Sequence, residues 1–240
     1  MNLIIDVGNT NVKLAVFDGD KLIEKHVIEH KNTLKAYNEL IKSYDLKSGI
    51  ISSVGEIDSN LIKDINNKIH LIILNSETKI PFKNLYKTPT TLGVDRLALI
   101  SAAVKHLPNQ NVLVIDAGTC ITFDFINAKN NYLGGAISPG INLRYRALHD
   151  LTANLPLLEP TLPKTIIGNS TDSSMHSGVI NGVIAEIEGI VKEYRKNHKH
   201  LTVILTGGDS DFLSKQLKND IFANSNLLLE GLNHILEYNN

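Results

Sequence analysis

The sequence has very little of some residues that define whole classes of protein. Among 240 residues it contains one cysteine and no tryptophan. The single cysteine, Cys120, excludes an intrachain disulfide framework and a cysteine-based zinc site. Because structural disulfides belong mainly to oxidising compartments, a reducing compartment is the default expectation.

Long hydrophobic runs are also missing. No stretch approaches the roughly 20 apolar residues that a membrane-spanning helix needs. The N-terminal segment, residues 1–6, has no basic region followed by a hydrophobic one, as a signal peptide would. We therefore expect a cytoplasmic protein that does not associate with membranes.

Charge of one sign is not in excess. The 24 basic and 25 acidic residues leave a net charge of -1, so no bulk field attracts nucleic acid or anionic lipid. The short basic stretch at 192–200 is typical of the solvated end of a helix. The apolar content of 42% is ordinary for a globular protein, and 240 residues can form one large domain or two small ones.

Two common nucleotide-binding signatures are absent as well. Neither Gly-x-x-x-x-Gly-Lys-[Ser/Thr] nor Gly-x-Gly-x-x-Gly occurs in the chain. P-loop NTPases, dinucleotide-binding proteins and protein kinases therefore lose their main support from the sequence.

What the sequence does contain is one short pattern that occurs twice. An apolar strand leads into Asp-Val-Gly-Asn-Thr at 6–10, and a second strand follows at 12–17. In the middle of the chain, an apolar strand leads into Asp-Ala-Gly-Thr at 116–119, and an alternating strand follows at 121–126. The repetition favours a tandem duplication. Two such halves facing each other would leave a cleft with both glycine turns at its floor.

The rest of the chain alternates between strand and helix patterns. The loop at 76–92 is long enough to indicate a function or a domain junction. Ser170 or Thr171 suits the N-cap of a long helix. Apolar spacing predicts helices at 33–44, 61–67, 97–105, 141–150, 172–195, 211–218 and 232–238, and further strands at 21–28, 49–53, 71–74 and 201–205.

Residues 6–13 have the chemistry of a cradle for a triphosphate. Gly8 lets the backbone approach phosphate oxygens, Asn9 and Thr10 offer hydrogen-bond donors, and Lys13 supplies a positive charge. Asp6 could hold Mg²⁺ through water. The alternative is a plain hairpin whose polar residues satisfy the turn backbone. The repeat at 116–119 and a third strand end, Thr-Gly-Gly-Asp at 206–209, favour the cradle, because an actin-like ATPase core keeps two phosphate loops and a nucleoside loop at such places.

Asp95 and Arg96 precede a predicted helix. The carboxylate could accept a hydroxyl proton, while Arg96 and the helix dipole favour an anionic substrate. The alternative is that Asp95 stabilises the helix and pairs with Arg96 on the surface. The segment at 134–140 could close over a ligand or form a tight strand-to-helix turn. We expect Cys120 to be a small buried residue rather than a nucleophile.

Taken together, these segments closely resemble the type III pantothenate kinases of bacteria, members of the acetate and sugar kinase/Hsc70/actin superfamily. The Gly-x-Asp-Arg element at 93–96 and the Thr-Ala-x-Leu-Pro element at 152–156 are particular to that family. The resemblance implies an α/β fold with two similar ribonuclease-H-like (actin-like ATPase) halves, residues 1–92 and 93–240. Each half would have a mixed sheet flanked by helices, and the halves would surround a central cleft.

The resemblance also implies a reaction, the ATP-dependent phosphorylation of pantothenate at its primary hydroxyl to 4'-phosphopantothenate. This is the first step of coenzyme A biosynthesis. Asp95 would be the general base, and Asp116 would hold the monovalent cation, potassium or ammonium, that the family needs beside Mg²⁺. The ATP phosphates would contact Asp6, Val7, Gly8, Asn9, Thr10, Asn11, Val12, Lys13 and Thr119. Pantothenate would contact Tyr86, Gly93, Val94, Asp95, Arg96 and Thr171.

Family members are homodimers with the substrate pocket near the subunit interface, so Thr171 could serve the neighbouring protomer. Two positions depart from the family pattern: Cys120 stands where alanine is common, and Leu97 replaces a frequent aromatic residue. Two competing functions follow from relatives on the same core. One is a nucleotide-binding accessory regulator of transcription without kinase activity, and the other is a sugar kinase or a phosphatase.

Overall fold

The computed structural model describes residues 1–53, 59–217 and 220–240, which form two compact units. The first unit contains residues 1–109, 130–132 and 226–240, and the second contains 110–129 and 133–225. The sequence places the boundary between the predicted halves after residue 92. In the structure the helix that follows residue 93 packs within the first unit, so this unit extends to Asn109. Within the described ranges, no helix is long and apolar enough to cross a membrane.

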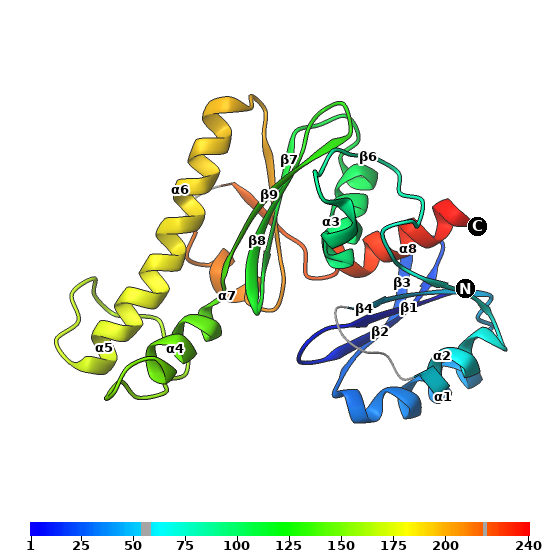
Figure 1. Cartoon of the computed structure of the whole chain (residues 1–240), viewed down its shortest axis with the longest axis horizontal. Coiled ribbons are helices and arrows are strands. Elements are labelled where there is room, and N and C mark those ends of the chain that lie inside the picture. Colours follow the sequence, from blue (N-terminus) through cyan, green and yellow to red (C-terminus); the bar gives the residue numbers. More distant parts are fainter. Residues whose placement is uncertain (54–58, 218–219) are drawn as a thin grey trace. The chain divides into compact units, whose positions relative to one another are not determined.

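The first unit is built on a five-stranded sheet of order β3-β2-β1-β4-β5 (Figure 1). Strands β1 (Asn2–Val7), β2 (Val12–Asp18) and β3 (Lys21–Ile28), which match three predicted strands, form an antiparallel meander. Strands β4 (Ser48–Ser53) and β5 (His70–Ile73) continue the sheet in parallel with β1. The strands predicted at 12–17 and 21–28 are joined by a hairpin turn, with Gly19 at a φ of 56° that favours glycine.

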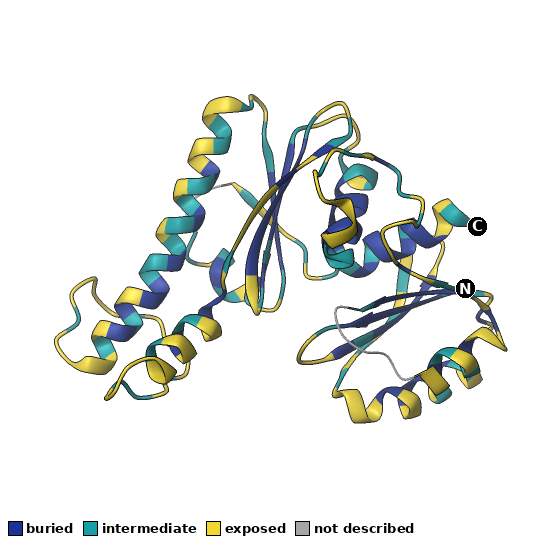
Figure 2. Ribbon diagram, viewed as in Figure 1, coloured by how far each residue is buried: buried dark blue, intermediate teal, exposed yellow. Residues whose placement is uncertain are grey.

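Helices cover both faces of this sheet because successive strand residues point to opposite sides. Leu3 and Ile5 of β1 join the apolar cluster under α1 (Thr33–Ser43) and α2 (Ser59–Asn66). Ile4, between them, joins the cluster under α3 (Val94–His106) and α8 (Leu227–Asn239). Figure 2 shows the buried residues on the inner strands and the exposed ones along the outer side of α1. Two 3-10 turns, η1 (His30–Asn32) and η2 (Pro89–Thr91), lie before α1 and α3.

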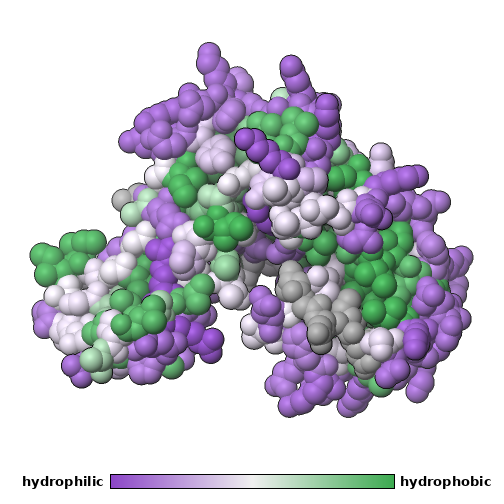
Figure 3. Space-filling model, in the orientation of Figure 1, coloured by the Kyte–Doolittle hydropathy of each residue, from purple (hydrophilic) through white to green (hydrophobic). Residues whose placement is uncertain are grey.

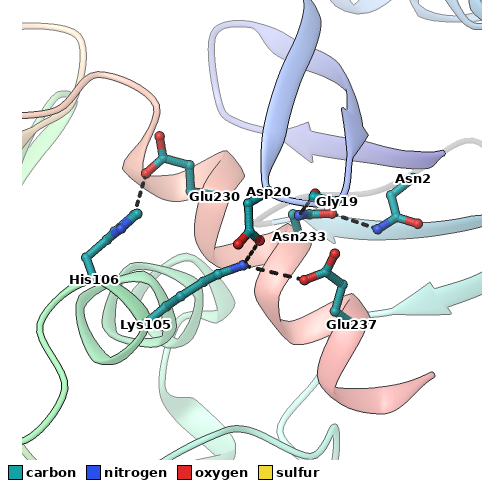
Figure 4. A network of polar contacts seen from close by, with 8 residues as sticks. All are labelled: Asn2, Gly19, Asp20, Lys105, His106, Glu230, Asn233 and Glu237. Atoms are coloured by element: carbon teal, nitrogen blue, oxygen red, sulfur yellow. Dashed lines mark hydrogen bonds and ion pairs between the residues drawn. The ribbon is translucent and has the colours of Figure 1, made fainter.

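The C-terminal helix α8 returns to the N-terminal sheet. Its fully buried Asn233 donates to the Gly19 carbonyl and accepts from the Asn2 amide, both at 2.9 Å (Figure 4). A Cβ atom on Gly231 would lie 1.8 Å from the carbonyl oxygen of Ala98, so only glycine permits this approach of α8 to α3. At the C-terminal end of α3, Lys105 pairs with Asp20 and with Glu237 of α8, and His106 pairs with Glu230 of α8.

The second unit is built on the strands β11-β10-β7-β8-β9. Their bounds are β7 (Val112–Ala117), β8 (Cys120–Ile126), β9 (Asn131–Pro139), β10 (Thr202–Thr206) and β11 (Ile221–Ala223). The first two residues of β9 belong to the first unit, where they pair with β6 (Lys83–Asn84). The helices are α4 (Ile141–Asp150), α5 (Thr171–His176), α6 (Gly182–Asn197) and α7 (Ser210–Ser214).

The core of the second unit lies between its sheet and α6. Phe123 and Phe125 of β8 pack with the apolar stripe of α6 that the sequence predicts, including Val183 and Ile187. The predicted helix at 172–195 is interrupted by a π-helical turn, η3 (Ser177–Asn181). There the Ser177 hydroxyl donates to the carbonyl of Ile166, and the Asn181 amide donates to Ser177. The predicted N-cap is Ser170, in a reciprocal capping box with Ser173.

The glycine-rich segment at 134–140 is mostly strand rather than turn, because β9 continues to Pro139. A Cβ atom on Gly135 would lie 1.5 Å from the Phe123 carbonyl oxygen, so glycine is needed for close packing of β9 on β8. The predicted helix at 211–218 is shorter in the structure, because α7 ends at Ser214; Lys218 lies outside the described residues.

Candidate active site

The turn between β1 and β2 presents polar side chains at one end of the first sheet. The register pairs Asp6 with Lys13 and Val7 with Val12, so residues 8–11 form the turn. The Gly8 amide donates to the Asn11 carbonyl at 3.1 Å and closes it. Asn9, Thr10 and Asn11 are exposed, and their side chains make no hydrogen bond to another described residue. Their donors are therefore available to an anion.

Three charged residues, Asp6, Lys13 and Asp95, interact at the end of the sheet that carries this turn. The Asp6 carboxyl is buried, with 6% of the residue exposed, and the Lys13 ammonium lies 3.2 Å from it. Burial raises the pKa of Asp6, Lys13 opposes this shift, and the negative charge of Asp95 adds to it. Asp95 is 89 residues away in sequence, yet it is close enough to act on Asp6 because α3 packs on this face of the sheet.

Asp95 lies in the first turn of α3, after the N-cap Gly93. Its Oδ1 accepts a hydrogen bond from the Arg96 backbone N–H at 2.8 Å. A Cβ atom on Gly93 would lie 2.4 Å from that oxygen, so glycine leaves room for the carboxylate to fold back over the helix N-terminus. The helix dipole favours a negative charge there.

Arg96 is buried, with 6% of the residue exposed, so the alternative of a surface pair with Asp95 is wrong for this arginine. Its guanidinium carbon lies 5.6 Å from the centre of the Tyr86 ring, within the range of a cation–π contact. The Tyr86 ring in turn stacks on Tyr132, with 6.1 Å between ring centres and 27° between planes. The structure thus brings Tyr86, Asp95 and Arg96 together in one unit.

The second unit carries the repeat of the glycine turn. The Gly118 amide donates to the Cys120 carbonyl at 2.9 Å, and the Gly140 amide donates to the Thr119 carbonyl at 3.0 Å. A Cβ atom on Gly140 would lie 2.0 Å from the Gly118 carbonyl oxygen. The start of α4 is therefore held directly against the turn that carries Thr119.

The loop after β10 joins the same place. Strand β10 runs parallel to β7 and pairs Thr206 with Asp116, so the two strand ends are neighbours. Gly207, at a φ of 95°, has no room for a Cβ atom, which would lie 2.2 Å from the Ala117 carbonyl oxygen. The Asp209 amide donates to that same carbonyl at 2.9 Å, and burial raises the pKa of the Asp209 carboxyl. The start of α4 and the loop after β10 thus both pack against the turn at 116–119.

Two residues singled out in the sequence, Thr171 and Cys120, are exposed. Thr171 is exposed and is the first residue of α5, in the second unit. Cys120 is exposed, so the prediction of a buried residue is wrong. It is the first residue of β8, directly after the glycine turn, and the buried part of the strand begins only at the next residue, Ile121. That the two glycine turns face one another across a cleft stays a prediction.

Reasoning from the sequence missed Ser52 and Tyr132. Ser52 is buried on β4, beside Asp6 in the register, and Tyr132 is fully buried behind Tyr86. A small polar residue after an apolar strand run was a signal for the first, whereas nothing local marks the second. Among the described residues, no group of three or more histidine, cysteine, aspartate or glutamate side chains could hold a metal ion. A metal site here would use fewer protein ligands and more water, as Mg²⁺ often does.

Two sheet-based units, each with a strand, a glycine turn and a second strand, define the fold of actin-like ATPases and sugar kinases. A glucokinase from an Antarctic psychrotroph superposes with a TM-score of 0.55 at 12% identity, covering 99% of this chain and 98% of its own. A Campylobacter jejuni protein, assigned to the Baf family of transcriptional activators, superposes with a TM-score of 0.64 at 22% identity over 99% and 98%.

Sequence comparison identifies the family within this fold. The model of the type III pantothenate kinase family matches residues 2–193. A type III pantothenate kinase of Christiangramia forsetii is 50% identical, over 100% of this chain and 99% of its own. That of Flavobacterium johnsoniae is 47% identical, over 99% and 98%. The chain belongs to the type III pantothenate kinase family, as the sequence motifs predict.

Proposed function

We propose that this chain transfers the γ-phosphoryl group of ATP to the primary hydroxyl of pantothenate, forming 4'-phosphopantothenate, in the first step of coenzyme A biosynthesis. Its place in the type III pantothenate kinase family carries the proposal. Asp6, Lys13 and Asp95, gathered at one end of the first sheet, support it.

The nucleotide phosphates bind the turn at residues 6–13 and, in the second unit, Thr119. The exposed amides and hydroxyl of residues 9–11 and the Lys13 ammonium donate to phosphate oxygens. A buried carboxylate beside this turn fits Mg²⁺, which Asp6 would hold through water. When bound, Mg²⁺ supplies positive charge that stabilises the transferring phosphoryl group.

Pantothenate binds on the α3 side of this turn, among Tyr86, Gly93, Val94, Asp95 and Arg96, and Thr171 completes its site from its own or a neighbouring protomer. Arg96 offers the positive charge that the pantothenate carboxylate needs. Asp95 orients the hydroxyl and accepts its proton as the oxygen attacks the γ-phosphorus. The Arg96 amide at 2.8 Å keeps the Asp95 carboxylate in place.

Asp116 binds a monovalent cation, potassium or ammonium. Its carboxylate lies at the carboxyl end of β7, beside the Gly207 turn. A Cβ atom added to Gly207 would lie 2.4 Å from Oδ1 of Asp116. The backbone carbonyl of Ala117 lies 2.2 Å from the same Cβ position and offers a second oxygen ligand to such a cation.

The active form is a homodimer. Large apolar side chains are exposed on α4 and on the irregular segment 151–170, where Figure 3 shows hydrophobic residues gathered beside α4 and α5. Such patches mark interaction surfaces. They comprise Leu143, Leu151, Leu157, Leu162, Ile166 and Ile167. Sedimentation velocity tests this: the wild type should run as a dimer, and a variant with Ile166→Lys and Ile167→Lys as a monomer.

A coupled assay for ADP release tests the activity. We expect turnover with ATP, Mg²⁺ and pantothenate, faster with potassium than with sodium. ADP release without an acceptor would indicate a phosphatase, and release with glucose but not pantothenate would indicate a sugar kinase. Nucleotide binding without any turnover would favour the regulatory function.

A further inference from the structure

Ser52 lies in one row with the two charged residues of the phosphate turn. Across the first sheet, Asp6 of β1 is the register partner of Lys13 on β2 and of Ser52 on β4. Register partners on neighbouring strands share a face of the sheet. All three side chains therefore belong to the face on which α3 packs, at the end of the sheet where Asp95 acts on Asp6.

The Ser52 hydroxyl is buried and has no hydrogen-bond partner among the described residues. Only 1% of the residue is exposed, and its Oγ makes no hydrogen bond within the part of the chain that the structure describes. Buried polar groups are normally paired, because a hydroxyl that leaves water without a new hydrogen bond is costly. An alanine would fill the same space without that cost. The hydroxyl therefore requires an explanation beyond packing.

Tyr37 supplies an instructive contrast. Its hydroxyl is the other buried side-chain group without a partner among the described residues. Tyr37 packs with Leu3, Ile5 and Val7 under α1, on the opposite face of the same sheet. No charged residue of the phosphate turn lies on that face. The two hydroxyls thus share burial and lack of a partner, but only Ser52 adjoins Asp6.

We infer that Ser52 is a positioning residue for the Mg²⁺-nucleotide, and that its hydroxyl binds a water of the Mg²⁺ hydration shell at Asp6. The inference rests on the proposed kinase function. Mg²⁺ gives up its water reluctantly, so an ion at Asp6 keeps several waters that need partners. Lys13 occupies Oδ2 of Asp6 from the β2 side, at 3.2 Å. Ser52 offers a neutral donor and acceptor from the β4 side.

The test compares Ser52→Ala with Tyr37→Phe, which removes the other unpaired hydroxyl. Calorimetric titration with ADP measures affinity in Mg²⁺ and again in EDTA, and thermal unfolding of the free protein measures stability. Ser52→Ala should bind Mg²⁺-ADP about tenfold more weakly, the worth of one buried hydrogen bond. It should bind ADP in EDTA as the wild type does, with an unchanged or higher midpoint of unfolding. Tyr37→Phe should leave both affinities unchanged.

Each other outcome overturns the inference. Wild-type affinity in Ser52→Ala would make the hydroxyl a structural feature only. An equal loss in EDTA would place it on the nucleotide rather than on the metal. If Tyr37→Phe lost the same amount of affinity for Mg²⁺-ADP, the cause would be a non-specific destabilisation of the first unit. If the wild type itself bound no Mg²⁺-ADP, the proposed kinase function would fail first, and the inference with it.

Discussion

Replacing Asp95 with asparagine separates chemistry from folding at this site. The variant keeps a side-chain oxygen that can accept the Arg96 N–H now held at 2.8 Å by Asp95. The group still fits against the N-cap Gly93, because aspartate and asparagine have nearly the same shape. What is lost is the negative charge and the ability to accept a proton from the substrate hydroxyl.

The expected losses differ widely in size. General-base catalysis contributes roughly 10²–10⁴-fold, so the kcat for pantothenate phosphorylation should fall by about that factor. This equals about 3–5 kcal/mol in the activation free energy. The free energy of unfolding should fall by only about 0.3–1 kcal/mol, from the lost charge at the helix N-terminus. Removing the repulsion between Asp95 and Asp6 offsets part of even that.

The assay pairs steady-state kinetics with urea unfolding. A matched control is Asp211→Asn, since Asp211 is likewise the second residue of its helix and is exposed. It should lose a similar small amount of stability and keep its kcat. If Asp95→Asn retained kcat within about threefold of the wild type, Asp95 would not be the base, and the assignment of this carboxylate would be refuted.

Three further predictions concern stability. Gly207→Ala should cost about 2–4 kcal/mol, because the residue has a positive φ and its new Cβ would meet the Ala117 carbonyl at 2.2 Å; a wild-type urea midpoint would show that the loop adjusts freely. Asn233→Ala should cost about 2 kcal/mol by leaving Asn2 without its partner, and a midpoint equal to that of the wild type would mean that α8 is held by apolar contacts alone. Burial raises the pKa of Asp6 above its ordinary value of 3.8. Between pH 3.8 and the folded-state pKa, the folded protein therefore binds more protons than the unfolded chain. Stability should therefore fall as pH rises from 3.8 through the folded-state pKa, and Asp6→Asn should flatten that part of the profile; parallel profiles would contradict the raised pKa.

The sequence was sufficient for most of the fold because its periodicities are clear. The apolar run of β1 predicted a strand, and in the structure Leu3 and Ile5 join one core while Ile4 joins the other. The apolar stripe of α6 likewise predicted its buried face. Strand β11 and the π-helical turn were missed. β11 has three residues and depends on pairing with β10, and the turn depends on a Ser177 hydrogen bond to a carbonyl 11 residues away.

The site was predicted as motifs rather than as an arrangement. Glycine turns and the Asp95-Arg96 pair stand out locally, because special backbone and charge at a helix start are local properties. The cation–π contact of Arg96 with Tyr86 is completed by Tyr132, which stacks on Tyr86 from a later segment of the chain. Ser52 gained its significance only from the register of β4 with β1. Non-local pairing of this kind has no local signal.

The most direct test of the account is whether one nucleotide is bound by turns from both units. Calorimetric titration of the wild type with Mg²⁺-ADP should give one site per chain. Lys13→Met in the first unit and Thr119→Val in the second should each weaken that same site by about tenfold or more. Two independent sites, or wild-type affinity in Thr119→Val, would contradict the claim that both turns bind a single polyphosphate.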